Sequence, residues 1–177
     1  MRYIALLRGI NIGGKKKIRM IDLKILFEIL KFKNVRTYIQ SGNVIFDFDA
    51  TDTIKLADQI EHKISETYEF LVKIIIRTDY ELRDLVNNNP FLKEANIELD
   101  QLYVTFMSDI PDPNKVLLLD VKKEENERFL IISREVYLYC PNGYGRTKLN
   151  NAVFEKKLNI IATTRNWKTI TKILINL

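Results

Sequence analysis

Apolar residues along the first half of the chain fall into short continuous runs and longer segments with helical spacing. The runs predict strands over residues 3–8, 35–40, 44–48 and 72–77. The helical spacing predicts helices over residues 20–30 and 52–68. A capping box, Thr78 with Glu81, begins a further helix to about Val86. The first six elements follow the β-α-β-β-α-β order of ferredoxin-like folds.

The second half repeats the start of this order after a break at residues 87–90, Asn-Asn-Asn-Pro. Its pattern predicts a strand, a helix, a hairpin and a helix over residues 102–107, 112–119, 128–140 and 149–158. Where a closing strand would follow, we predict that Thr164 caps a last helix over residues 165–175. The predicted fold class is α+β, a mixed α/β chain of two ferredoxin-like βαββαβ-type halves, residues 1–88 and 89–177, with an extra C-terminal helix. One larger α+β sheet is the alternative, because the halves share element order without sequence similarity.

The composition is that of a packed globular protein. The chain has 177 residues, of which 46% are hydrophobic and 29% charged. No apolar run approaches the roughly 18 residues needed to cross a bilayer, and the N-terminal apolar stretch is too short for a signal peptide. The single cysteine, Cys140, has no partner for an internal disulfide. We therefore expect a cytoplasmic protein with no membrane partner.

Basic residues concentrate at the two ends of the chain. Residues 1–38 hold ten Lys or Arg and two Asp or Glu, residues 39–140 hold eleven and twenty, and residues 141–177 hold seven and one. If the two basic segments meet in space, they form a positive face that attracts phosphates or other anions. The alternative is a solvated surface of mixed charge, which is common in lysine-rich proteins.

Residues 9–16, Gly-Ile-Asn-Ile-Gly-Gly-Lys-Lys, come close to a phosphate-binding P-loop, in which backbone amides cradle phosphates and a lysine reaches them. Lys15 stands at the lysine position, but Lys16 replaces the hydroxyl residue that would hold a magnesium ion. An anion-binding loop without nucleoside triphosphatase chemistry is therefore the functional interpretation. A glycine turn with solvated lysines is the alternative.

Residues 143–148, Gly-Tyr-Gly-Arg-Thr-Lys, form a second basic glycine loop just before a predicted helix. Arg146 and Lys148 supply positive charge, and the helix N-terminus adds its dipole. Arg165, in the first turn of the last predicted helix, is a further candidate for the same cleft. The alternative is a connecting turn in which Thr147 caps the helix.

Familiar catalytic and metal-binding sets are absent from the sequence. His62 is the only histidine and is predicted to face solvent, which excludes the usual Ser-His and Cys-His triads and histidine-rich metal sites. Cys140 is expected to be a buried thiol rather than a nucleophile. Tyr137 and Tyr139 lie on one strand face, where they suit either base stacking or ordinary packing. We predict no metal site and no cofactor.

Residues 6–14, Leu-Leu-Arg-Gly-Ile-Asn-Ile-Gly-Gly, and 38–46, Tyr-Ile-Gln-Ser-Gly-Asn-Val-Ile-Phe, resemble the opening signatures of an uncharacterised bacterial family, the domain of unknown function 1697. Residues 89–91, 143–149 and 163–167 resemble its later signatures. The resemblance implies two ferredoxin-like halves and a cytosolic protein, and it supplies no catalytic residues. Lys16 departs from the family pattern, because members often carry an uncharged polar residue there.

The leading hypothesis is that the two glycine loops form a basic cleft that binds a phosphorylated ligand or nucleic acid. The candidate residues share the ability to hydrogen-bond an anion, and they are Arg8, Asn11, Lys15, Ser41, Asn43, Arg146, Lys148 and Arg165. The first alternative is an enzyme acting on a small anionic substrate in the same cleft, with Tyr144 joining Ser41 and Asn43 as polar groups. The second is a protein-interaction module that uses Tyr137 and Tyr139.

Overall fold

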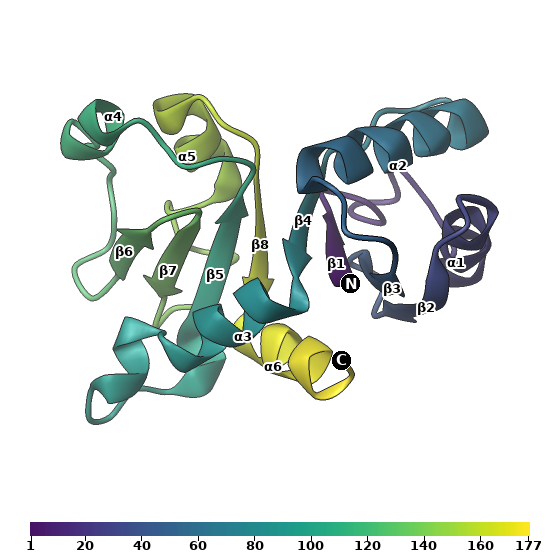
Figure 1. Ribbon diagram of the computed structural model, residues 1–177. Coiled ribbons are helices and arrows are strands. Elements are labelled where there is room, and N and C mark those ends of the chain that lie inside the picture. The colour runs from purple at the N-terminus through teal and green to yellow at the C-terminus, as the bar shows by residue number, and fades with distance from the viewer. The chain divides into compact units, whose positions relative to one another are not determined.

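The computed structural model describes all 177 residues as two compact units, and each unit contains its own four-stranded antiparallel sheet (Figure 1). The first unit comprises Met1–Asp84 with Ile173–Leu177, and the second comprises Leu85–Lys172. The chain is therefore a mixed α+β protein with two separate sheets, as predicted. No helix combines the length and the apolar character needed to cross a membrane.

The sheet of the first unit has the strand order β2-β3-β1-β4. Both neighbours of the central strand β1 run antiparallel to it, and the helices α1 and α2 provide the crossovers. The elements are β1 (Arg2–Leu7), α1 (Met20–Ile29), β2 (Lys33–Tyr38), β3 (Asn43–Asp47), α2 (Thr53–Tyr68) and β4 (Ile74–Thr78), followed by α3 (Asp79–Asn87). The predicted ends of α1 and α2 are correct to within one residue, whereas β2 lies two residues before its predicted position.

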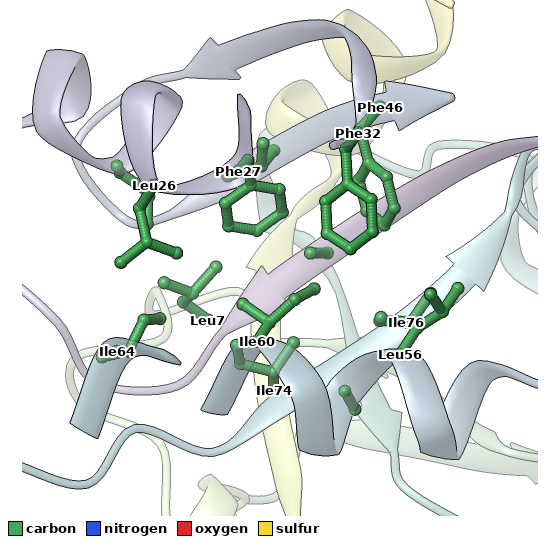
Figure 2. Packing of buried hydrophobic residues seen from close by; sticks show 14 of the residues in the cluster. Leu7, Leu26, Phe27, Phe32, Phe46, Leu56, Ile60, Ile64, Ile74 and Ile76 are labelled. Carbon is green, nitrogen blue, oxygen red and sulfur yellow. The ribbon is translucent and has the colours of Figure 1, made fainter. Parts of the chain in front are cut away.

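The core of the first unit lies between the sheet and its two helices (Figure 2). Leu7 from β1 and Ile60 from α2 point toward each other across this layer. Aromatic rings fill the end near β2, where Phe32 stacks on Phe46 with ring centroids 4.4 Å apart. Because these large apolar side chains leave water on folding, the layer stabilises the positions of both helices against the sheet.

The sheet of the second unit has the equivalent order, β6-β7-β5-β8. Its core includes Leu138 of β7 and Phe154 of α5, both fully buried. The elements are β5 (Leu102–Met107), α4 (Pro113–Leu117), β6 (Arg128–Ile132), β7 (Glu135–Tyr139), α5 (Asn151–Leu158) and β8 (Ala162–Asn166), followed by α6 (Trp167–Ile175). Two short 3-10 turns, Pro90–Lys93 and Leu99–Gln101, precede β5.

The prediction that the last helix takes the place of a closing strand is wrong, because the structure has the strand β8 there. Thr163 and Thr164 pair with Phe106 and Thr105 of β5, and the two threonine hydroxyls of Thr105 and Thr164 lie 2.7 Å apart. Threonines favour a pleated strand because their branched side chains pack well on its surface. The helix begins later, at Trp167, and its cap is Asn166 rather than Thr164, because the Asn166 side chain accepts a hydrogen bond from the Thr169 N–H.

The two units repeat one feature that the element order alone does not require. Ile4 of β1 is paired with Arg77 of β4, and Val104 of β5 is paired in the same way with Arg165 of β8. Both arginines are buried. A buried arginine at the same place in each last strand supports the view that the two units share one architectural plan.

Candidate functional site

The glycine-rich connection between β1 and α1 forms a miniature hairpin. The Lys15 N–H donates to the Ile12 carbonyl at 3.0 Å, and the Asn11 N–H donates to the Lys16 carbonyl at 3.2 Å. Gly13 and Gly14 occupy the turn with φ of 58° and 75°, a conformation that glycine adopts without strain. The Lys15 amide is therefore engaged in the turn and does not face a ligand as a P-loop amide does.

Asn11 closes the base of this hairpin. Its Nδ2 donates to the carbonyls of Ile18 and Gln40 at 2.9 and 3.0 Å, and its Oδ1 accepts from the Ile18 N–H at 2.9 Å. Three hydrogen bonds occupy most of the bonding capacity of one amide. Asn11, a predicted ligand residue, thus holds the β1–α1 loop against the β2–β3 turn.

A pocket of about 450 Å³ lies beside the hairpin. Two cationic side chains and one carboxylate line it, together with an aromatic ring from the end of α2. The lining residues are Asn11, Gly14, Lys17, Ile18, Arg19, Met20, Asp22, Gln40 and Tyr68. Of these residues, only Asn11 was predicted as a site residue. Gln40 and Tyr68 come from distant parts of the sequence, so no local pattern pointed to them. The run of Lys15, Lys16 and Lys17 was the available signal for Lys17.

Charges around the pocket are only partly balanced. Arg19 donates to both Asp22 carboxylate oxygens, at 2.7 and 2.8 Å, and this pair lowers the pKa of Asp22 below its ordinary value. Burial, followed by the nearby Asp22 charge, raises the pKa of Tyr68. Lys16 donates to the Leu71 carbonyl at 2.6 Å. The hairpin and the pocket wall therefore carry more positive than negative charge.

The β2–β3 turn next to the pocket is built by Asn43 and Gly42. The fully buried Asn43 donates through Nδ2 to the Tyr38 carbonyl at 3.0 Å and to the Ser41 Oγ at 3.1 Å. Gly42 has a φ of 77°, and a Cβ there would lie 2.8 Å from the Leu7 Cβ. The predicted site residues Ser41 and Asn43 thus shape the turn. The half-buried Arg8 directly follows β1, and its N–H donates to the Lys73 carbonyl at 2.8 Å.

The second glycine loop, between β7 and α5, is organised around Tyr144. Its hydroxyl donates to the Thr164 Oγ1 at 2.9 Å and accepts from the Asn151 N–H at 3.2 Å. Burial raises the pKa of this phenol. Asn150, rather than Thr147, caps α5 by accepting from the Val153 N–H, whereas Thr147 accepts from the Leu149 N–H. Tyr144 is therefore part of an internal network.

The cationic candidates of the second unit differ in their surroundings. Arg146 is exposed, and the exposed Lys148 lies 3.2 Å from the Glu124 carboxylate. Arg165 is buried in β8, where its Nη1 donates to the Thr163 Oγ1 and the Thr164 carbonyl, both at 2.9 Å. Burial lowers the pKa of Arg165 to about 10. The hypothesis that these side chains share a cleft with the β1–α1 loop joins residues of both units and stays a prediction.

A second pocket, of about 460 Å³, was not predicted from the sequence. It lies at the β5–α4 connection of the second unit, the position equivalent to that of the first pocket. Its charged residues are mainly acidic: Asp109, Asp112 and Glu155, with Lys115. Asp112 caps α4, and Glu155 accepts the Ala162 N–H at 2.9 Å. No group of three or more His, Cys, Asp or Glu side chains is arranged to hold a metal ion.

The other residues discussed from the sequence are two tyrosines, one histidine and one cysteine, and each lies at the surface or in ordinary packing contacts. His62 is exposed and lies 3.4 Å from the Glu66 carboxylate. Cys140 is fully buried, and this burial raises the pKa of its thiol to about 11. Tyr137 is buried, whereas Tyr139 packs under the Arg128 guanidinium, 5.0 Å from the ring centroid.

Comparisons with known proteins give a family and a fold. The model of a family described as "Protein of unknown function (DUF1697)" matches residues 1–137. A similar solved structure is that of the conserved bacterial protein SP0830 from Streptococcus pneumoniae, with a TM-score of 0.76 and 24% sequence identity. The match covers 98% of this chain and 97% of that chain, and it establishes the fold. No curated protein matches the chain.

Proposed function

We propose, on the premise that the chain belongs to the DUF1697 family of proteins of unknown function, that its first unit binds a phosphorylated small molecule in the pocket beside the β1–α1 hairpin. One observation carries the proposal. Residues 8–19 contain five cationic side chains and no acidic one, and two of the five, Lys17 and Arg19, line a pocket of about 450 Å³. A concave site with concentrated positive charge attracts anions and favours phosphate oxygens as hydrogen-bond acceptors.

Lys17 and Arg19 are the groups within the pocket that suit a phosphate. The side chains of Lys15 and Lys17 make no hydrogen bond or ion pair in the structure, so a ligand would not have to displace an existing partner. Arg19 is bound to Asp22 at its exposed guanidinium, and an incoming phosphate would compete with that carboxylate. Charge-assisted bonds from Lys17 and then Arg19 would hold the anionic end of the ligand.

The other wall of the pocket favours a ligand with an organic part. Met20 and the ring of Tyr68 supply apolar surface, and Gln40 supplies an amide. Small-molecule sites usually combine such apolar surface with a few polar groups that fix orientation. The pocket therefore suits a phosphate ester better than free inorganic phosphate.

The test is calorimetric titration with pyrophosphate and with adenosine monophosphate as probes. We expect the double substitution Lys17→Gln and Arg19→Gln to weaken binding about tenfold or more, because it removes the two charge-assisted contacts from the pocket. The matched control is Lys122→Gln with Lys123→Gln, which removes the same charge from exposed positions in the second unit. Equal losses in the two variants would indicate a general charge effect and contradict the proposed site.

A wider form of the proposal includes the second glycine loop and nucleic acid as the ligand. It predicts that Arg146→Gln also weakens binding, and that labelled single-stranded oligonucleotides bind with an affinity that falls steeply with salt. If Arg146→Gln has no effect and oligonucleotides do not bind at low salt, the ligand is a small molecule held by the first unit alone.

A further inference from the structure

The outward side of α1 carries a row of three exposed isoleucines, flanked by the charged residues Lys24 and Glu28. Ile21, Ile25 and Ile29 are 57%, 47% and 56% exposed, and their spacing places them along one side of the helix. The opposite side of the same helix packs into the core through Leu23, Leu26 and Phe27. A helix that is apolar on both sides normally has both sides covered. The three isoleucines, which we call the α1 face, therefore indicate an interaction surface.

The equivalent helix of the second unit also ends in exposed apolar side chains. Leu117 and Leu118, which we call the α4 face, are 84% and 80% exposed, more than any other large hydrophobic residue of the chain. Both helices follow the first strand of their units. Adjacent exposed apolar side chains such as these become favourable contacts when a partner covers them.

The two faces belong to sequence segments of opposite charge. Between residues 15 and 36, the segment that contains the α1 face, there are eight Lys or Arg and two Asp or Glu. Both acids are already paired, Asp22 with Arg19 and Glu28 with Lys24. Between residues 108 and 127, the segment that contains the α4 face, there are six Asp or Glu and three Lys. Complementary charge around complementary apolar surface favours association and selects its orientation.

We propose that the α1 face of one copy of this chain docks on the α4 face of a second copy. The occupant of each face is then present in the same sequence, and both exposed apolar faces are explained together. An anionic membrane would suit the basic surroundings of α1 but would repel the aspartates around Leu117 and Leu118. The contact is head-to-tail, so each copy keeps one face free and further copies can add until the assembly closes.

The expected association is weak. Only a few large apolar side chains contribute on each side, which is less than a stable interface of about 1,200–2,000 Å² requires. We therefore expect dimers and larger species that form reversibly at high protein concentration, and raised salt should reduce them because part of the attraction is electrostatic.

Sedimentation velocity over a protein concentration series tests the proposal with two double variants. Ile21→Glu with Ile25→Glu destroys the α1 face, and Leu117→Lys with Leu118→Lys destroys the α4 face. Each variant alone should stay monomeric. A mixture of the two should form a one-to-one dimer that does not grow, because one intact α1 face then meets one intact α4 face.

The matched control is Ile54→Glu, which alters an isoleucine that is 59% exposed on α2 and should leave self-association unchanged. Far-UV circular dichroism checks that each variant is folded, as expected for substitutions at exposed positions. A wild-type chain that stays monomeric at every concentration would overturn the proposal, as would a failure of the mixed variants to pair. Binding to phosphatidylglycerol vesicles that requires Ile21 and Ile25, without self-association, would instead assign the α1 face to a membrane.

Discussion

The two units have the same strand order but differ in the connection that follows their first strand. In the first unit this connection has twelve residues, 8–19, with five cationic side chains, whereas in the second it has five residues, 108–112, with two aspartates. A pocket of similar volume lies at this place in both units. The shared architecture thus sets where a pocket forms, and the connection decides its charge and the ligands that it can attract.

The two connections are also stabilised by different means. A single amide, that of Asn11, holds the long loop through three hydrogen bonds. The short one is held at its start by two hydrogen bonds between Ser108 and the backbone of Ile161, and at its end by Asp112, which caps α4. The longer connection of the first unit therefore has room for several lysines, and the hydrogen bonds of Asn11 hold it in one conformation.

The largest expected difference between the units concerns their glycine turns. Gly42→Ala should destabilise the protein by about 3 kcal/mol, because the residue has positive φ and its new Cβ would lie 2.7 Å from the Ile10 Cδ1. Gly143→Ala should cost about 1 kcal/mol, because φ is again positive but nothing lies within 4 Å of the added Cβ. Urea unfolding followed by circular dichroism measures both free energies, and equal losses would contradict the packing argument.

Tyr144→Phe tests the hydroxyl network of the second unit, whereas in the first unit the Tyr3 hydroxyl bonds only backbone groups of the β3–α2 connection. Loss of the phenol oxygen leaves the Asn151 N–H and the Thr164 hydroxyl without one partner each, so we expect a loss of about 1.5 kcal/mol. Tyr103→Phe is the matched control, because the Tyr103 ring packs 5.3 Å from that of Tyr144 while its hydroxyl makes no hydrogen bond. Thermal unfolding should separate the two variants by several degrees.

Acid should affect the first sheet more than the second. Arg2 and then Asn34 bind the Asp47 carboxylate and lower its pKa from 3.8 to about 2, whereas the equivalent pair in the second unit is Leu102 with Tyr139. A lowered folded-state pKa gives stability above pH 3.8 that is lost as the pH falls toward 2. Asp47→Asn should therefore cost about 1 kcal/mol at neutral pH, and this cost should shrink as the pH falls toward the folded-state pKa of about 2.

Stability curves measured between these pH values check this expectation. Asp49→Asn provides the control, since it removes an exposed carboxylate of the same unit that makes no ion pair. A loss for Asp47→Asn that does not change with pH would show that its effect is not electrostatic.

The smallest expected effect concerns the ion pair between Arg19 and Asp22, which limits the positive charge available in the first pocket. Asp22→Asn should release Arg19 and tighten pyrophosphate binding about threefold, because an exposed ion pair of this kind is worth less than about 1 kcal/mol. Glu28→Gln is the control, because its partner Lys24 does not line the pocket. Calorimetry that gives the same gain for both variants would indicate that net charge, rather than the release of Arg19, controls affinity.

Local pattern predicted most of the fold. The helical spacing of α1 and α2 and the capping box of Thr78 and Glu81 agree with the structure, because these signals lie within a few residues of one another. The strand β8 was missed because Thr164 resembles a helix cap in sequence, and only its pairing with Thr105 across the sheet determines its role. The family resemblance was confirmed over residues 1–137.

The pocket was predicted less completely. Its basic loop was visible in the sequence, but the turn at Gly13 and Gly14 decides which lysine lines the pocket, and Lys17 rather than Lys15 does so. Tyr68 is distant in sequence and joins the pocket only because α2 packs on the same sheet as α1. Such tertiary contacts leave no local pattern for a sequence argument to use.

The buried Cys140 has a practical consequence. Thiol-directed reagents react with the thiolate, and a pKa of about 11 together with complete burial keeps this form scarce and inaccessible at neutral pH. We therefore expect the wild-type chain to react only slowly with maleimides. Single cysteines introduced at exposed positions of either unit can carry a fluorophore or a spin label without prior removal of Cys140.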